Sequence, residues 1–262
     1  MTIVTLLSDF GLADGYVAQM KGVILDKCPR AVVVDISHGI ERHNIPMGSF
    51  ILETSVPYFP DGTVHVAVVD PGVGGARKSI VIECEKGILV GPDNGLMARA
   101  CEKLGLKSIY HIQEEFQRKP TSTTFQGRDV FAYAAGLIAC GRKPDGVGPG
   151  ISKLEKLPVS QPRLLDRRLT CQVLHEDNFG NVITNVDEKL VRELPVKSGE
   201  PLTVQAGTRK LRAQYARSYN DVEKGTLAVL LGSQGFLELA VREGSASDKL
   251  NAKPLDKLDL RF

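Results

Sequence analysis

The sequence predicts an α/β domain, in which helices cover a mixed or parallel sheet, followed by a smaller all-β domain. Two observations predict this class. Segments of strand and helix character alternate from the start of the chain to about residue 140, which is typical of a sheet with helices packed on it. The stretch 146–168 then combines Pro, Gly and charged residues with little hydrophobic periodicity, and only short strand-like runs follow it.

The first domain begins with a short β-rich run at 2–7, which we expect to be a buried strand. A segment with helical periodicity follows at 15–27 and ends near Pro29. The Ala- and Val-rich run 31–36 is typical of a strand buried on both faces. The alternation continues with helices expected over 46–56, 96–104 and 130–140, and with strands over 62–69, 78–84 and 87–90.

The second domain is expected to contain strands separated by turn residues. The runs that we assign to strands are 169–175, 181–185, 201–204, 226–231 and 235–241. Short strands at this spacing predict a small β-barrel or a sandwich.

Composition and charge exclude several classes of protein. The chain has 262 residues, 42% of them apolar and 24% charged, with a net charge of +2, which is ordinary for a soluble globular protein. Scattered Lys and Arg argue against nucleic-acid binding, and no apolar run approaches the roughly 20 residues that span a bilayer. The chain also starts without the basic segment of a signal peptide. We therefore expect a cytoplasmic protein with neither a membrane nor a nucleic-acid partner.

The cysteines point to the same compartment. Their number is five, which is odd, and no two have C-x-x-C spacing. We expect buried free thiols in a reducing environment and no zinc or other metal site, because no Cys/His cluster has the spacing of metal ligands.

Acidic motifs follow two predicted strands of the first domain. Asp9 and Asp14 come after the first strand, where ligands bind in open α/β sheets and where a carboxylate can accept hydrogen bonds from both hydroxyls of a ribose. Asp70 ends a later strand and begins the glycine loop 72–75, whose backbone can approach a ligand closely. Each motif also has an ordinary interpretation: Asp9 or Asp14 can cap the next helix, and the loop can be a plain turn.

Three further motifs use the same residue types. The sequence GPDNG at 91–95 is turn chemistry at the entry to a helix, and TTFQGRD at 123–129 precedes another helix, where capping is again an alternative. In the second domain, DNFGN at 177–181 sets a carboxylate and amides beside an aromatic ring. This group can read the edge of an adenine, or it can form a tight hairpin. None of the motifs is a Walker loop or a dinucleotide fingerprint.

Taken in order, the motifs resemble those of the S-adenosyl-methionine (SAM) hydrolases that form adenosine, also called SAM hydroxide adenosyltransferases, which are related to fluorinase and chlorinase. The resemblance covers nearly the whole chain through SDFG-x-x-D-G-Y-V, VVDPGVG-x-x-R, GPDNG, TF-x-GRD-x-F, D-x-FGN-x-x-TN and S-x-G-x-L. It implies an α/β domain over 1–150, a linker over 151–167 and a β-barrel domain over 168–262. It also implies a homotrimer whose sites lie between the N-terminal domain of one subunit and the C-terminal domain of the next.

The resemblance assigns substrate contacts in the first domain. Asp9 matches the residue that holds the ribose hydroxyls, and Asp14 matches one that faces the amino group of the methionine portion. Tyr16 stands where the halogenases carry a serine, and we include it among the substrate-binding residues.

The resemblance also assigns contacts in the second domain. Asp177 is expected to face the methionine amino group, and Ser233 is expected to lie near its carboxylate. Phe179 and Asn181 are expected to hold the adenine, with Tyr219 packed against it.

The hydrolases differ from the halogenases in a water-activating trio of Asp, Arg and His. Asp70 and Arg77 match the first two members, and the halogenases carry Tyr in place of this Asp. Gly127 stands where fluorinase uses a serine to desolvate fluoride. The third member departs from the family, because Gln126 replaces the His, and a glutamine can orient water but cannot take a proton at neutral pH. His43, where the halogenases place an aromatic residue over the substrate, is a candidate replacement.

The expected function is hydrolysis of SAM to adenosine and L-methionine by in-line attack of water or hydroxide at the 5′ carbon, with SAM as the substrate and no cofactor. In this hypothesis Arg77 and Gln126 hold the water, and Asp70 polarises it or accepts its proton. The alternative is a weakly active or non-catalytic protein that binds SAM or adenosine, in which Gln126 marks lost chemistry. Asp70 and the glycine after Gln126 disfavour a halide-using transferase, and the absence of a second-substrate motif disfavours methyl transfer.

Overall fold

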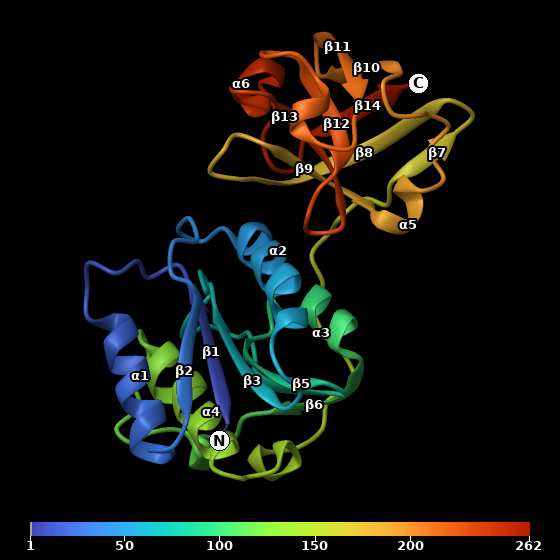
Figure 1. Cartoon of the computed structure of the whole chain (residues 1–262). Helices are drawn as coiled ribbons and strands as arrows, with labels where there is room; N and C mark the ends of the chain where they lie inside the picture. The colour runs from blue at the N-terminus through green and yellow to red at the C-terminus, as the bar shows by residue number, and fades with distance from the viewer. Residues whose placement is uncertain (1) are drawn as a thin grey trace. The chain divides into compact units, whose positions relative to one another are not determined.

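The structure, a computed structural model, describes residues 2–262, which divide into two compact units (Figure 1). The first unit ends at Leu157 and the second is Pro158–Phe262. The division falls inside the segment 151–167 that we expect to be a linker. The residues just before the division belong to the first unit, because the Ile151 N–H donates to the Ile109 carbonyl and Leu154 packs against the core of that unit.

The first unit contains a mixed sheet of six strands in the order β2-β1-β3-β5-β4-β6. The strands are β1 (Ile3–Ser8), β2 (Val32–Ser37), β3 (Thr63–Val68), β4 (Ser79–Cys84), β5 (Gly87–Pro92) and β6 (Leu106–His111). The pairs β2–β1, β1–β3 and β3–β5 are parallel, whereas β4 pairs antiparallel with β5 and with β6. The α/β class predicted for this half is confirmed.

Helices cover both faces of this sheet (Figure 1). One face carries α1 (Tyr16–Lys27) and α4 (Tyr133–Ala139), and the other carries α2 (Ile45–Ser55) and α3 (Ala98–Leu104). The helix expected over 130–140 is in fact a π-helical turn, Gly127–Ala132, followed by α4. Short 3-10 turns lie at Val56–Tyr58, Glu114–Phe116 and Pro144–Val147.

The strand expected at 31–36 differs from the prediction in its burial. Strand β2 lies at the edge of the sheet, where it pairs with β1, and its Val32 is 39% exposed. The strands buried on both faces are β1, β3, β5 and β4, whose side chains enter the two opposite cores. A run of Val and Ile therefore indicates a strand but does not place it in the middle of a sheet.

The second unit is a closed barrel, as the family resemblance implies. Its sheet has the order β14-β10-β11-β12-β13-β9-β8-β7, and a further pairing of β14 with β8 closes a ring of seven strands that leaves β7 outside. The strands are β7 (Arg163–Leu165), β8 (Arg168–Glu176), β9 (Val182–Asp187), β10 (Pro201–Ala206), β11 (Arg209–Tyr215), β12 (Leu227–Leu231), β13 (Phe236–Val241) and β14 (Lys257–Arg261). Two short helices, α5 (Glu188–Val191) and α6 (Ala246–Leu250), and a 3-10 turn at Tyr219–Asp221 complete the unit.

The arrangement of the first sheet decides where polar residues gather. Strands β1, β2 and β3 are parallel neighbours, so their carboxyl ends lie along one edge. The residues that follow these strands are Asp9, His38 and Asp70, which places all three near that edge.

No helix within residues 2–262 is long and apolar enough to cross a membrane. All five cysteines are free, and Cys140 differs from the expectation because it is exposed rather than buried.

Candidate functional site

A cavity of about 340 Å³ opens at the carboxyl edge of the first sheet. It is lined by Asp9, Phe10, Asp14, Tyr16, Arg42, His43, Val68, Asp70, Val73, Thr124, Phe125, Gln126 and Gly127. The structure thus brings together nearly all the candidate residues of the first domain, which are widely separated in the sequence. The remaining one, Arg77, lies directly behind the wall of the cavity, in contact with Asp70 and Gln126.

Asp70, Arg77 and Gln126 form one hydrogen-bonded group. The Arg77 Nε donates to both Asp70 carboxylate oxygens at 3.0 Å, and its Nη2 donates to Asp70 Oδ2 and to Gln126 Oε1. The Arg77 Nη1 donates to the Ser79 Oγ at 2.9 Å. Their side chains are 5% exposed for Asp70 and 11% for Arg77, so this is a buried forked ion pair. Because the Gln126 oxygen accepts from Arg77, its amide nitrogen is left as the donor end of the side chain.

The loop that carries Asp70 is held by the neighbouring GPDNG motif. Asn94 Nδ2 donates to the Val69 carbonyl at 2.9 Å, which fixes the backbone just before Asp70. The loop also turns on itself, because the Val73 N–H donates to the Asp70 carbonyl. At Gly74 the backbone φ is +75°, and a Cβ would lie 2.8 Å from the Thr123 carbonyl oxygen, so only glycine fits there. The glycine loop is therefore a tight turn packed against the 123–126 segment.

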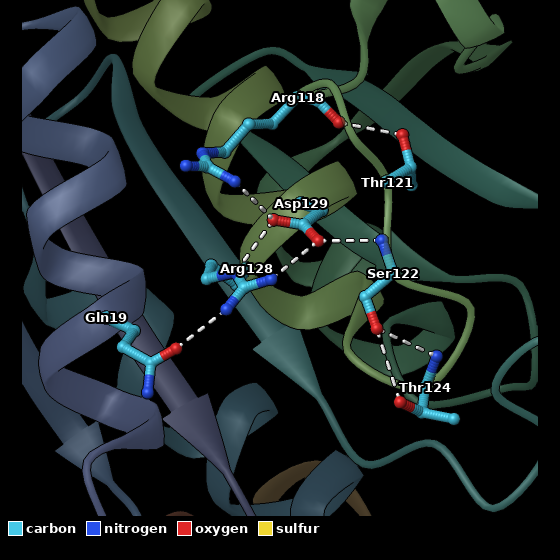
Figure 2. Close-up of polar contacts among 7 residues, drawn as sticks. All are labelled: Gln19, Arg118, Thr121, Ser122, Thr124, Arg128 and Asp129. Carbon is cyan, nitrogen blue, oxygen red and sulfur yellow. Dashed lines mark hydrogen bonds and ion pairs between the residues drawn. The ribbon is translucent and has the colours of Figure 1, made fainter.

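The Arg-Asp pair of the TTFQGRD motif supports the Gln126 loop (Figure 2). Asp129 is fully buried and accepts two hydrogen bonds from Arg128, at 2.7 and 2.9 Å, and one from the Ser122 N–H at 2.8 Å. Arg118 approaches the same carboxylate at 3.6 Å, and Arg128 also donates to Gln19 of α1. Burial acts to raise the Asp129 pKa, but these donors and charges outweigh it and hold the pKa below its ordinary value.

Aromatic rings form the apolar wall of the cavity. The rings of Phe10, Tyr16 and Phe125 pack together, with centroids 5.1 to 5.9 Å apart. A Cβ on Gly127 would lie 3.2 Å from the Phe10 ring and 3.4 Å from the Phe125 ring. Glycine at this position therefore allows the rings to close over the start of the π-helical turn.

Asp9 is fixed by the backbone of the segment after β2. The His43 N–H donates to Asp9 Oδ2 at 2.9 Å, and His43 itself has a positive φ of 64°. The interpretation of Asp9 or Asp14 as a helix cap is wrong, because α1 starts after Gly15 without any side-chain cap. Both carboxylates instead line the cavity.

In the second unit, Asp177 organises the hairpin between β8 and β9. Its Oδ1 accepts from the N–H groups of Phe179 and Asn181, and its Oδ2 accepts from Asn181 Nδ2, all at 2.9 Å. Gly180 has a φ of +76° and leaves no room for a Cβ beside Ser245. The hairpin interpretation of this motif is correct. The turn leaves the Phe179 ring 79% exposed while Asn181 is buried.

Tyr219 and a carboxylate that the sequence did not single out form a second polar group. The Tyr219 hydroxyl donates to Glu238 Oε1 at 2.7 Å, and Glu238 is buried on β13. Burial raises the pKa of Glu238, and the nearby charge of Asp177 adds to this shift. Burial and the bond to Glu238 also raise the pKa of the Tyr219 phenol. Ser233 lies exposed in the turn between β12 and β13. The available signal for Glu238 was one acidic residue within an apolar strand.

Two other hollows gather fewer of the candidate residues. One on the barrel unit, beside β11 and α6, has a volume of about 420 Å³, and its ionisable lining side chains are the two cations Arg212 and Lys249. Another, of about 760 Å³ in the first unit, is lined by residues of the 111–119 segment and contains none of the candidate residues. Within the described part of the chain, no group of three or more His, Cys, Asp or Glu residues is placed to hold a metal ion. The cavity at the edge of the first sheet is therefore the candidate active site.

Comparison with known proteins identifies matches over both units. The family model for the SAM hydroxide adenosyltransferase N-terminal domain matches residues 4–148, and the model for the C-terminal domain of the same family matches residues 171–259. The chain is 39% identical to a protein named (R)-S-adenosyl-L-methionine hydrolase from Methanocaldococcus jannaschii, over 100% of this chain and 97% of the relative. It is 36% identical to a protein of the same name from Salinispora tropica, over 97% and 96%.

More distant relatives and solved structures agree. A fluorinase from Nocardia brasiliensis is 26% identical over 96% of this chain and 94% of the relative. A crystal structure of an uncharacterized conserved protein from Thermotoga maritima superposes with a TM-score of 0.94 at 35% identity, covering 99% of this chain and 100% of that one.

Proposed function

Since the chain belongs to the SAM hydroxide adenosyltransferase family, we propose that it hydrolyses S-adenosyl-L-methionine to adenosine and L-methionine. The relatives at 36–39% identity are named for the (R) sulfonium epimer, and we extend that preference to this chain. The structural observation that supports the proposal is the buried Asp70–Arg77–Gln126 group at the wall of a cavity that also contains Asp9.

Substrate binding divides between the two units. Asp9, fixed by the His43 N–H, accepts hydrogen bonds from the ribose hydroxyls. Asp14 is exposed at the cavity and faces the methionine ammonium group, while the Tyr16 ring covers the methionine portion. A sulfonium and an ammonium both favour a site lined by carboxylates.

The second unit supplies the remaining contacts of the proposal. Phe179 is exposed and stacks on the adenine, and Tyr219 packs against it. Asn181 hydrogen-bonds the adenine edge. Asp177 faces the methionine ammonium, and Ser233 binds the methionine carboxylate.

The reaction needs an aligned nucleophile more than an acid. The sulfonium sulfur departs as the neutral thioether of methionine, so no group has to protonate it. Water bound between Gln126 Nε2, which donates to its oxygen, and the Asp70 carboxylate, which accepts from it, forms the new C–O bond behind the 5′ carbon as the C–S bond breaks. Alignment of this kind is worth at most about 7–11 kcal/mol. Because attack by hydroxide on a cation destroys charge, the apolar aromatic wall of the cavity favours the step.

The fate of the water proton sets the pH dependence. Arg77 is a cation, Gln126 is a neutral amide, and Asp70 already accepts three hydrogen bonds from Arg77. No member of the group is a good proton acceptor, so the proton leaves to solvent or hydroxide attacks directly. The rate of hydrolysis is therefore slow and rises with pH.

We propose further that the enzyme acts in the cytoplasm on a small-molecule substrate, with no cofactor and no nucleic-acid partner. It assembles as a homotrimer, with each site formed at a subunit interface. The exposure of Phe179 (79%) and of Tyr16 and Tyr219 (46% each) supports this assembly, because apolar rings at a binding site are normally covered by a ligand or a partner.

The proposed function is tested with purified protein, each SAM epimer and ¹⁸O-labelled water. Adenosine and methionine should form in equal amounts, faster from the (R) epimer, with one ¹⁸O atom in the adenosine. The Asp70→Ala variant should lose most of this activity. Methionine without adenosine would refute the proposal. Tight binding of SAM without turnover would instead support the alternative that the chain is a non-catalytic binder, which the replacement of the family histidine by Gln126 suggests.

A further inference from the structure

A row of four polar side chains, Ser8, His38, Asp35 and Lys21, lies beneath the Asp9 turn and has no part in the proposed function. The Ser8 Oγ lies 2.7 Å from His38 Nδ1, and His38 Nε2 lies 3.1 Å from Asp35 Oδ1. Lys21 on α1 donates to Asp35 Oδ2 at 2.6 Å. Ser8 ends β1, Asp35 is on β2 and His38 follows β2. The row of side chains therefore joins two neighbouring strands to helix α1.

The order Ser, His, Asp is that of a hydrolytic triad, but the geometry excludes a nucleophilic role. Ser8 is fully buried and His38 is 5% exposed, so no substrate carbon can reach the serine oxygen. That oxygen also accepts a hydrogen bond from the Phe10 N–H at 3.3 Å. The hydroxyl is thus engaged as a structural donor to His38 and an acceptor from the backbone.

The charged residues Asp35 and Lys21, at one end of this row of side chains, determine which nitrogen of His38 carries the proton. Lys21 is a cation and Asp35 accepts from it. Burial acts to raise the Asp35 pKa, but Lys21 and His38 outweigh it and lower the pKa, so Asp35 is ionised. A carboxylate near Nε2 favours the proton on that nitrogen, although this contact is electrostatic rather than a well-aligned hydrogen bond. The Nδ1 is then the acceptor for the Ser8 hydroxyl.

His38 holds the Asp9 turn from both sides. Its ring fixes Ser8, the residue before Asp9, and its backbone carbonyl accepts from the Gly11 N–H at 2.9 Å, two residues after Asp9. Gly11 has a φ of +67°, which closes the turn. The same segment supplies the His43 N–H that binds the Asp9 carboxylate. Both the backbone and the carboxylate of Asp9 are therefore anchored to the segment 38–43.

We infer that His38 is a positioning residue for substrate binding, which acts through Ser8 to hold the Asp9 carboxylate where it meets the ribose. The inference rests on the proposed function, because Asp9 is the ribose contact in that proposal. Its expected signature is weaker substrate binding with little change in the chemical step, since Asp70, Arg77 and Gln126 lie on other strands and loops.

The chain offers a matched control in a second buried hydroxyl–imidazole pair. Thr5, three residues earlier on β1, lies with its Oγ1 2.8 Å from His65 Nδ1 on β3. Both residues are buried, and burial lowers the pKa of His65 to about 4, so it is neutral. Neither residue lines the cavity. Loss of this pair should cost stability without changing the Asp9 turn.

The test compares His38→Ala, His38→Asn and Ser8→Ala with His65→Ala and Thr5→Ala in the full chain. We expect KM for SAM to rise about tenfold in His38→Ala and Ser8→Ala with kcat within about threefold. His38→Asn, whose side-chain oxygen replaces the Nδ1 acceptor, should recover most of the loss. The control variants should lower the melting temperature and leave KM unchanged. An equal KM in His38→Ala and His65→Ala, or no recovery in His38→Asn, would overturn the inference.

A second readout needs no substrate. Amide hydrogen exchange of Gly11 and His43 in the ligand-free protein should be faster in Ser8→Ala than in Thr5→Ala, because only the first variant loosens the Asp9 turn. Unchanged exchange would refute the role of His38 even if the enzyme is active. If the wild-type protein shows no SAM turnover, the proposed function fails. Faster exchange in Ser8→Ala than in Thr5→Ala would still support the role of His38 in that case. Ser8→Ala removes only one hydroxyl, so the test does not depend on His38→Ala folding.

Discussion

The two units differ in how their candidate site residues are held and how far they are buried. In the first unit, Asp70 and Arg77 form a buried ion pair, and Gln126 and Asp9 are held by hydrogen bonds within the unit. In the barrel unit, the Asp177 turn is well bonded, but the aromatic residues proposed to bind adenine are exposed. If the proposed roles hold, the chemical group is preorganised inside one unit, whereas the exposed rings of the other unit bind only when the substrate covers them. Substitutions within the Asp70–Arg77–Gln126 group should therefore act on kcat, and substitutions of the exposed rings of the second unit should act on KM.

The largest effect is expected for Arg77→Met. The variant leaves the Asp70 carboxylate buried without its partner and frees Gln126, so kcat should fall by about 100-fold or more and the free energy of unfolding by about 3 kcal/mol. Steady-state kinetics and denaturant unfolding check both. Arg99→Met is the matched control, because Arg99 pairs with the buried Glu53 away from the cavity. It should lose stability and keep kcat. Equal kcat in the two variants would contradict a role of the Asp70–Arg77–Gln126 group in the chemical step.

A contrasting effect is expected for Phe179→Ala. Loss of a base-stacking ring is worth about 1–3 kcal/mol, so KM for SAM should rise about tenfold while kcat changes little. Since the ring is exposed, the free energy of unfolding should stay within about 0.5 kcal/mol of the wild-type value. Leu165→Ala, at a similarly exposed apolar residue on β7, should change none of these three quantities. A loss of kcat as large as that in Arg77→Met would contradict the division of roles.

Gln126→His tests whether a proton acceptor at position 126 speeds the chemical step. A ring nitrogen that can accept the water proton should raise kcat about tenfold and make the rate less dependent on pH. Gln126→Leu, which neither donates nor accepts, is the comparison and should lower kcat. The measurement is kcat between pH 6 and 9 for both variants. If the two variants behave alike, hydrogen bonding at this position plays no part in the reaction.

The buried carboxylate of Asp129 should make a pH-dependent contribution to stability. Its pKa is lower in the folded than in the unfolded chain, so its contribution to stability is present above the unfolded value of about 4 and is lost as pH falls through the lower folded value. Asp129→Asn should therefore lower the free energy of unfolding at neutral pH and weaken its decline in acid. Denaturant titrations from pH 7 to pH 3 measure this. A variant as stable as the wild type at pH 7 would show that the Arg128 pair contributes nothing.

The smallest effect, of opposite sign, is expected at Glu238 in the barrel unit. Its pKa is raised on folding, so its contribution is present below the unfolded value and is lost as pH rises through the folded value. Glu238→Gln keeps an acceptor for the Tyr219 hydroxyl and removes the buried charge. It should raise the free energy of unfolding at pH 7 to 8 and flatten its pH dependence there. A less stable variant would mean that the carboxylate charge itself is needed.

Much of the fold follows from the hydrophobic pattern. Strands β1 and β3 and helices α1 and α2 lie within one or two residues of the expected segments, because their apolar residues repeat with clear periods. Strands β6, β7, β11 and β14 were not predicted, because none of them contains the continuous apolar run by which the other strands were identified. The edge position of β2 also escaped prediction, because strand order depends on pairing between distant segments.

The site was predictable only in part, because several of its contacts join residues that lie far apart in the sequence. The sequence could suggest Asp9, Asp70 and Gln126 through motifs, and the fold gathers them at one cavity, while their chemical roles stay predictions. The partnership of Ser8 with His38 joins residues 30 positions apart, and Glu238 meets Tyr219 across 19 positions. No local pattern reports such contacts. They exist because neighbouring strands and turns bring together side chains that the chain order separates.

The central claim is that the Asp70–Arg77–Gln126 group presents an oxygen atom to the 5′ carbon of the substrate. A crystal structure with adenosine and L-methionine bound tests it most directly. The account predicts that the adenosine 5′ oxygen lies within hydrogen-bonding distance of Gln126 Nε2 and of the Asp70 carboxylate, with the ribose hydroxyls on Asp9. A complex in which the 5′ oxygen faces away from this group, or in which adenosine binds elsewhere on the protein, would contradict it.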